Sequence, residues 1–385
     1  MEEGKLKILI LHARVGNGHY KAAEVIRDKI EQLYPNATVY FEDGLEESSR
    51  VINFIAIKGY KNILKYVPEM FGSMYDRTDT PDKGAIEAGY KLINKYLTIR
   101  IKRMLRQIQP DIIFSTHPFV TRMCAYLKKK GKTNAKLATL ITDYAPHNMW
   151  VTDYSNIDKI LVATEEVKNS CIKKYGVPEV KLQVTGIPVS DKFTQKMNRE
   201  KILEEFELDG NLPVFLFFPG GGLGVGNGAE ILKDLLKCNT NYQLVVVAGK
   251  NEKLKEEFEE IVKEDTRNIR VLGFTNKVAE LMYISEAVIS KPGGLTSTEC
   301  LVAKKPMLII NVVPGQEEQN TSYLCNNGAA IRVKEGELAE ALETLLKRPV
   351  RVEQMKDMCA ILRQPNASKE IVDSLVKLYD MDKEE

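Results

Sequence analysis

The sequence predicts an α/β protein with two doubly wound parallel sheets, and three observations lead to this fold class. Short apolar segments alternate with longer amphipathic ones along the whole 385-residue chain. The apolar segments are nearly continuous, a pattern typical of parallel strands covered by helices on both faces. The alternation starts again after about residue 195, and a chain of this length is typical of two domains.

The first predicted domain spans residues 1–195 and opens with a strand, a helix and a second strand. These segments read KILILH, GHYKAAEVIRDKIEQLY and ATVYFED, at residues 7–12, 18–34 and 37–43. Four more apolar segments follow, at residues 111–117, 136–143, 159–165 and 181–186. They end in polar or small residues, so the loops after the strands are where a ligand site is expected.

The second predicted domain spans residues 196–366 and repeats the pattern. Its strand segments lie at residues 212–222, 242–249, 269–274, 286–294, 306–311 and 329–333. The remaining residues, 367–385, contain the helical segment ASKEIVDSLVKLYD.

The composition is that of a soluble globular protein, with 44% hydrophobic and 28% charged residues. No apolar run reaches the length of a membrane span, and the first residues lack the form of a signal peptide, so a cytoplasmic location is expected. The six cysteines never approach a C-x-x-C spacing, which argues against a zinc ribbon or a disulfide framework.

Positive charge is concentrated in one part of the chain. Residues 51–150 hold 17 Lys and Arg against 7 Asp and Glu, although the whole chain carries only +2. Nucleic acid and an anionic bilayer are both candidate partners for such a region. Lys58, Lys61 and Lys65 flank an apolar stripe at helical spacing, which favours membrane contact, although an ordinary buried amphipathic helix has the same pattern.

The stretch KPGGLTSTE, Lys291 to Glu299, joins a predicted strand to a predicted helix. A helix that begins near Leu295 would present unpaired N–H groups and the positive end of its dipole, which suits a phosphate. Glu299, one turn further, would repel phosphate and is better suited to a ribose hydroxyl. The pattern therefore indicates a nucleotide, although helix capping by Thr296 or Ser297 would explain the same residues.

All four histidines lie at or after the ends of predicted strands of the first domain: His12, His19, His117 and His147. Such clustering indicates catalysis or a metal site, but no H-x-x-x-H or H-E-x-x-H spacing supports zinc. We therefore expect no essential metal. His19 opens a helix, where the dipole favours the neutral imidazole that a general base requires. Asp143 is a second candidate base.

The loop before His19 also has an alternative interpretation. Gly16 and Gly18 follow the first strand, as in a dinucleotide-binding fold, but Lys21 stands where the third glycine of that fingerprint belongs. An NAD-dependent oxidoreductase is therefore the alternative from another enzyme class.

Several long segments, in order, resemble the diacylglycerol glycosyltransferases. The segments are ILILHARVGNGHYKAAEVI, STHPF, TDYAPHNMWVTDYSNIDKILVATEEV, VTGIPV and ISKPGGLTSTECLVAKKPMLIINVVPGQEEQN. This family includes bacterial processive diacylglycerol glucosyltransferases and plant monogalactosyldiacylglycerol synthases, and is related to the N-acetylglucosaminyltransferase that makes lipid II.

The resemblance implies a GT-B fold, two Rossmann-like domains that face a central cleft, and a final helix that crosses back to the first domain. It also implies inverting transfer from a UDP-sugar with no essential metal, and it places His19 at the base position. The implied donor site comprises Gly221, Gly222, Phe274, Gly294, Leu295, Thr296, Glu299, Gln316, Glu317 and Asn320. Gly18, His117, His147 and Trp150 are assigned to the acceptor side.

The sequence thus predicts a peripheral enzyme of the inner membrane face that moves glucose from UDP-glucose to diacylglycerol or a glycosyl-diacylglycerol. No nucleic acid partner is expected. A donor of UDP-galactose or UDP-N-acetylglucosamine with another lipid acceptor is an alternative, and so is a UDP-sugar sensor without catalytic activity.

Overall fold

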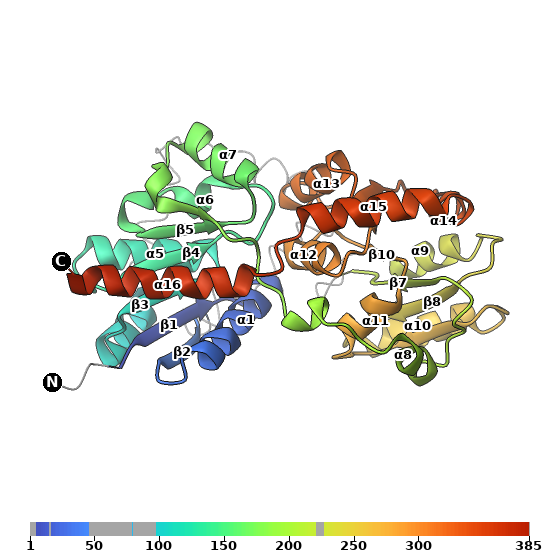
Figure 1. Ribbon diagram of the computed structural model, residues 1–385, viewed down its shortest axis with the longest axis horizontal. Helices are drawn as coiled ribbons and strands as arrows, with labels where there is room; N and C mark the ends of the chain where they lie inside the picture. Colours follow the sequence, from blue (N-terminus) through green and yellow to red (C-terminus); the bar gives the residue numbers. More distant parts are fainter. Residues whose placement is uncertain (1–4, 15–16, 46–78, 80–97, 221–226, 385) are drawn as a thin grey trace. The chain divides into compact units, whose positions relative to one another are not determined.

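The computed structural model describes residues 5–14, 17–45, 79, 98–220 and 227–384. The chain forms two compact units (Figure 1). Unit 1 comprises Met1–Val189 and Asn366–Glu385, and unit 2 comprises Ser190–Pro365. Each unit contains one six-stranded sheet whose strand pairs are parallel, so the predicted fold class, two Rossmann-like domains of the GT-B type, is confirmed.

The sheet of unit 1 has the strand order β2-β1-β3-β4-β5-β6. Its strands are β1 (Lys7–His12), β2 (Thr38–Asp43), β3 (Ile112–Ser115), β4 (Lys136–Leu140), β5 (Lys159–Val162) and β6 (Leu182–Val184). Its helices are α1 (Gly18–Leu33), α5 (Pro118–Lys129), α6 (Asn148–Val151), α7 (Glu165–Tyr175) and α16 (Ala367–Glu384), and residues 98–108 are also helical. The chain first builds outward from β1 to β2 and then resumes on the other side of β1 at β3.

The sheet of unit 2 has the order β12-β11-β10-β7-β8-β9. Its strands are β7 (Val214–Phe217), β8 (Gln243–Val247), β9 (Ile269–Leu272), β10 (Ala287–Ser290), β11 (Met307–Ile309) and β12 (Ala330–Arg332). Its helices are α8 (Arg199–Glu205), α9 (Gly228–Leu235), α10 (Glu252–Val262), α11 (Val278–Ile284), α12 (Gly294–Val302), α13 (Gln316–Asn326), α14 (Leu338–Lys347) and α15 (Pro349–Leu362). Read from β9, this is the 3-2-1-4-5-6 order of dinucleotide-binding domains, which reverses direction between β7 and β10.

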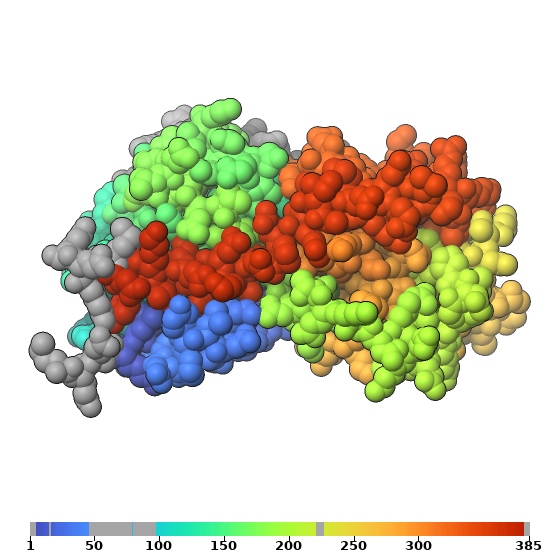
Figure 2. Space-filling view, viewed as in Figure 1, coloured from blue at the N-terminus to red at the C-terminus, as the bar shows by residue number. Residues whose placement is uncertain are grey.

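The core of unit 1 includes residues from the far end of the sequence. Ala22, Ala23, Ile26 and Ile30 recur at helical spacing in α1 and are fully buried. Ile371, Val372 and Leu375 of α16 are also fully buried in the same apolar cluster. The outer face of α16 forms the surface beside α1 (Figure 2). The segment after unit 2 therefore completes the core of unit 1.

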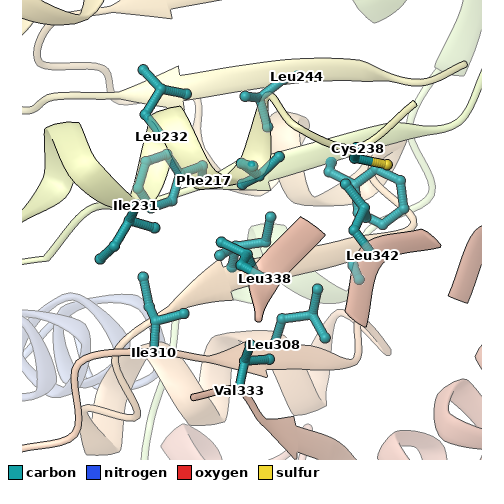
Figure 3. Packing of buried hydrophobic residues seen from close by; sticks show 14 of the residues in the cluster. Phe217, Ile231, Leu232, Cys238, Leu244, Leu308, Ile310, Val333, Leu338 and Leu342 are labelled. Carbon is teal, nitrogen blue, oxygen red and sulfur yellow. The ribbon is translucent and has the colours of Figure 1, made fainter. Parts of the chain in front are cut away.

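The core of unit 2 packs α9 and α14 onto the sheet (Figure 3). Leu232 from α9, Leu342 from α14, and Phe217, Leu244 and Leu308 from three strands are all fully buried. At about 25 cal/mol per Å² of apolar area removed from water, such clusters supply most of the driving force for folding. They also fix the strand ends from which the candidate site is built.

None of the helices within the described ranges combines the length and apolar character that crossing a bilayer requires.

Candidate active site

Both units reverse the direction of strand order once, and this is where ligands bind in open parallel sheets. The loops that follow the two strands at such a point diverge and leave room beyond their carboxyl ends. In unit 1 these strands are β1 and β3, and in unit 2 they are β7 and β10. The predicted base and the predicted phosphate-binding stretch follow two of these four strands.

His19 is held in one tautomer by the backbone after β3. It is the second residue of α1, and its Nδ1 lies 2.5 Å from the carbonyl oxygen of Thr116. A carbonyl oxygen can only accept a hydrogen bond, so Nδ1 carries the proton and donates it to Thr116. In the neutral ring Nε2 therefore carries the lone pair, as a general base requires.

Two hydroxyl groups complete the attachment of α1 to the neighbouring loops. The hydroxyl of Thr116 donates to the backbone carbonyl of His19 at 2.8 Å. The hydroxyl of Thr142 lies 3.2 Å from Nδ1 of His19. Asp143, the other predicted base, is the residue after Thr142 and is half-buried. The side chain of Thr142 therefore lies beside the imidazole of His19.

Two aromatic rings lie beside His19, and burial keeps its imidazole neutral. The His117 ring lies 4.7 Å from that of His19, centroid to centroid, and the Trp150 ring lies at 6.1 Å. Burial lowers the pKa of His19 to about 4, and only the Thr116 carbonyl opposes this. Burial, followed by repulsion from His19, also holds the pKa of His117 well below its usual value. Both rings are therefore neutral near pH 7.

The other two predicted histidines have different surroundings. His12 is 2% exposed, and its ring packs against Tyr20 and Phe41 with centroids 4.9 and 4.5 Å away. His147 caps α6, since its Nδ1 accepts a hydrogen bond from the Met149 amide at 3.1 Å. The structure thus brings the rings of His19 and His117 together.

The predicted acceptor-side residues Gly18 and Trp150 lie near His19. Gly18 is the first residue of α1, directly before His19, and Trp150 belongs to the short helix α6. The Asn148 amide at the start of α6 donates to Asp79 at 2.8 Å, and the Tyr175 hydroxyl donates to the same carboxylate at 2.6 Å. Asp79 thereby fixes the helix that carries Trp150.

In the described parts of both units, no three His, Cys, Asp or Glu side chains are grouped closely enough to hold a metal ion.

In unit 2, helix α12 begins at Gly294, with Gly293 as its N-cap and no side-chain cap. The alternative prediction, capping by Thr296 or Ser297, is therefore wrong. Ser297 donates its amide to the Gly293 carbonyl at 2.9 Å, and the Thr298 hydroxyl bonds back to the Gly294 carbonyl at 2.7 Å. The amides of Gly294, Leu295 and Thr296 form the first turn, where a helix supplies no acceptors, and they are available to an anion.

Glycine keeps the backbone beside this helix accessible. A Cβ at Gly293 would meet nothing within 4 Å, so there is open space at the helix start. Gly220, after β7, has φ +91°, and a Cβ there would lie 2.9 Å from Cδ of Lys291. The Lys291 stem thus lies along the Gly220 backbone, and its ammonium belongs to the same switch point.

Helix α13 contributes the next predicted donor residues. It begins at Gln316 after Gly315, whose φ of 106° and ψ of −130° suit only glycine. Glu317 accepts from the Val313 amide at 2.9 Å, and burial raises the pKa of its carboxyl, against the effects of Lys291 and Val313. Asn320 is fully buried and donates to the Pro292 carbonyl at 3.0 Å, so it holds the loop that leads into α12.

The remaining predicted residues are placed as follows. Glu299 is half-buried in the second turn of α12. Phe274 follows β9, is 60% exposed, and has the Lys250 ammonium 5.0 Å from its ring centroid. Outside the described residues lie Gly221, Gly222, Lys58, Lys61 and Lys65.

Sequence reasoning did not single out Thr116, Thr142 or Lys291. Each directly follows, or lies two residues beyond, a strand whose end borders the site. Their positions just after β3, β4 and β10 would identify them as site residues once the strand order is known.

Family comparison gives two matches that together cover most of the chain. Residues 19–189 match the monogalactosyldiacylglycerol synthase family, and residues 224–372 match the C-terminal domain of glycosyltransferase family 28.

Curated relatives are similar over almost the full length. A processive diacylglycerol beta-glucosyltransferase of Staphylococcus saprophyticus is 31% identical over 378 residues, which cover 97% of this chain and 93% of the relative. The Bacillus subtilis protein of the same name is 30% identical over 379 residues, with 97% and 96% covered.

Solved structures agree with the fold at low sequence identity. Acinetobacter baumannii MurG is 14% identical with a TM-score of 0.63, and 97% of this chain and 99% of that chain are covered. The UDP-GlcNAc 2-epimerase of Neisseria meningitidis, solved with UDP-GlcNAc bound, is 15% identical with a TM-score of 0.61, and 97% and 100% are covered.

Proposed function

Because the chain belongs to the family of the processive diacylglycerol beta-glucosyltransferases, we propose that it transfers glucose from UDP-glucose to diacylglycerol or a glycosyl-diacylglycerol, with inversion, at a membrane surface. The prediction of a UDP-sugar-dependent glycosyltransferase is confirmed at the level of the family. The alternatives of an NAD-dependent oxidoreductase and of a sensor are set aside on the same ground.

The observation that carries the proposal is the state of His19. Its Nδ1 proton is committed to the Thr116 carbonyl, and burial holds its pKa at about 4. Nε2 therefore carries an unprotonated lone pair near pH 7. An enzyme that deprotonates an alcohol, a weak acid, requires such a group beside the reacting hydroxyl.

In the proposed reaction, Nε2 of His19 takes the proton of the acceptor hydroxyl. The acceptor oxygen forms a bond to the anomeric carbon from the face opposite UDP, while the bond from that carbon to the UDP oxygen breaks. UDP leaves with the electron pair, and the α anomer of the donor becomes a β product. The imidazolium then returns its proton to solvent.

The start of α12 supports the departure of UDP. Negative charge grows on the diphosphate as the bond breaks, and the amides of Gly294, Leu295 and Thr296 are already oriented to receive it. Lys291 adds a positive charge at the same strand end. We therefore propose that the reaction needs no metal ion, since dipoles and a lysine supply the stabilisation that a divalent cation gives in other transferases.

A direct assay tests the proposal. The purified protein is incubated with UDP-glucose, UDP-galactose or UDP-N-acetylglucosamine and vesicles of diacylglycerol, with and without EDTA. We expect a β-glucosyl lipid from UDP-glucose, and an undiminished rate in EDTA. An α-linked product would exclude inversion, a preference for another donor would change the sugar, and full inhibition by EDTA would contradict the metal-free mechanism.

Membrane contact has its own test, in which Lys58, Lys61 and Lys65 of the basic region are replaced. Cosedimentation with vesicles that contain anionic lipid should decrease when the three lysines are replaced by glutamate, at about 1 kcal/mol of attraction per residue near the surface. Equal replacements at the exposed Lys237, Lys263 and Lys334 of unit 2 are the control. Binding that does not change would locate the membrane contact elsewhere.

A further inference from the structure

The histidine beside the base has a polar atom with nothing to bind in the described structure. His117 is 4% exposed, and its Nδ1 is buried without a hydrogen-bond partner among the described residues. A buried polar group left unpaired usually costs about as much as a hydrogen bond contributes. Such a group therefore calls for an explanation, and a ligand that pairs with it is one.

Comparison with His147 shows that the unpaired Nδ1 of His117 is not a consequence of its place at a helix N-cap. Both residues are the N-caps of helices, in extended backbone conformations. His147 uses its Nδ1 to accept an amide hydrogen bond, whereas His117 makes no side-chain cap bond. Its ring instead lies edge-on to His19, with the centroids 4.7 Å apart.

The backbone around His117 is fixed. Its amide donates to the Ser115 hydroxyl at 3.3 Å, and its carbonyl accepts from the Thr121 hydroxyl at 3.1 Å. Pro118 at the first position of α5 has no amide to offer the ring. The backbone that carries the ring is thus fixed, and the ring lies beside that of His19.

We propose that Nδ1 of His117 makes a hydrogen bond to the oxygen-bearing head of the acceptor, a neutral alcohol, and so holds it while His19 takes the proton. This rests on the proposed function, since it assigns a residue to the acceptor of that reaction. The head is expected to be uncharged because the two adjacent rings are both neutral and so carry no positive charge to balance an anionic headgroup. His117 would be a binding residue and His19 the base.

Two substitutions separate this role from a structural one. His117→Asn keeps a hydrogen-bonding atom near the position of Nδ1, whereas His117→Leu removes it. We expect His117→Leu to raise the KM for sn-1,2-dioctanoylglycerol about tenfold, the usual effect of one hydrogen bond, and His117→Asn to stay within about threefold. The Tm of His117→Leu should not fall, because the substitution removes an unpaired polar atom from the free protein. A lower Tm with unchanged KM would make His117 purely structural and overturn the proposal.

A binding measurement without turnover distinguishes this inference from the proposed function. In protein with ¹⁵N-labelled histidine, the Nδ1 resonance of His117 should shift when dioctanoylglycerol in detergent micelles is added, but not with empty micelles or dioctanoyl phosphatidic acid. No shift in an enzyme that glucosylates dioctanoylglycerol would refute the inference alone. A shift without any sugar transfer would refute the proposed function alone. An equal shift with phosphatidic acid would refute the neutral-head assignment.

Discussion

The two switch points of this chain share a topology but differ in chemistry. In unit 1, the strand ends carry imidazole rings and threonine hydroxyls around His19. In unit 2, they carry glycines, the uncapped start of α12, and Lys291. The first set suits removal of a proton, and the second suits reception of a negative charge. The strand order of the sheet determines where a ligand binds, and the loop residues determine which reaction the ligand undergoes.

The strongest test of this division is removal of the base. His19→Ala should lower kcat about a hundred- to ten-thousand-fold, the range usual for general base catalysis. The Kd for UDP, measured by calorimetry, should not change, because its proposed site lies in unit 2. Lys21→Ala is the matched control, since Lys21 lies two residues further along α1, and its exposed side chain contacts Glu24 and the Tyr20 ring and not His19 in any recorded interaction. A large loss of UDP affinity in His19→Ala would contradict the assignment of proton removal to unit 1 and UDP binding to unit 2.

A methyl group at the start of α12 tests the second site without disturbing the fold. The Gly293 backbone, at φ −62° and ψ 141°, is accessible to alanine, and a Cβ there meets no atom within 4 Å. We expect Gly293→Ala to leave Tm unchanged and to lower kcat/KM for the UDP-sugar about a hundredfold, because displacing a bound reactant by 1 Å can cost that much.

Gly220→Ala provides the contrast, since φ there is +91° and the new methyl would meet Lys291. It should lower the free energy of unfolding by about 1–3 kcal/mol in a denaturant titration. If Gly293→Ala bound UDP-sugar normally, the diphosphate would lie elsewhere.

Lys291→Met should have a smaller effect on the same site. Methionine keeps an apolar stem against Gly220 but removes the charge. Affinity for UDP should fall about tenfold, the order expected for one hydrogen bond to a charged group. Calorimetry in rising salt should show a weaker salt dependence than for the unmodified protein. Lys237→Met, on an exposed lysine, is the control. Equal affinity in both variants would remove Lys291 from the site.

The acid limb of the pH dependence of kcat/KM should reflect the proposed base in unit 1. Because the pKa of His19 is about 4, the acid limb of kcat/KM should lie well below the ordinary histidine value of 6.5. The same lowered pKa means that the unfolded chain binds more protons than the folded one between about pH 6.5 and 4, so stability should fall as pH falls through this window. The lowered pKa of His117 likewise makes stability fall as pH falls. An acid limb of kcat/KM near pH 6.5 that persists in His117→Leu would show that His19 is exposed to solvent during catalysis.

Much of this architecture could be predicted from local sequence, because buried parallel strands are continuous apolar runs. KILILH and YQLVVVAG each contain a strand, β1 and β8. The helix that begins near Leu295 was predicted within one residue. Strand order could not be predicted this way, since it depends on tertiary packing between distant segments, and so the pairing of His19 with Thr116 was not foreseen.

Side-chain direction was the other limit. The sequence placed four histidines after strands of one sheet, but it could not show that His12 faces Tyr20 and Phe41 or that His147 caps a helix. Likewise, Thr296 and Ser297 have the composition of a cap, while the structure uses Gly293. Both outcomes depend on backbone geometry that residue type alone does not determine.

The location of α16 has a consequence for the order in which the chain folds during synthesis. Ile371, Val372 and Leu375 complete the apolar cluster of unit 1, yet they are translated only after the whole of Ser190–Pro365. The domain that leaves the ribosome first must therefore wait, with the part of its apolar cluster that α16 covers still exposed, until the second has been made. During that interval exposed Ile, Val and Leu side chains are a natural target for chaperones.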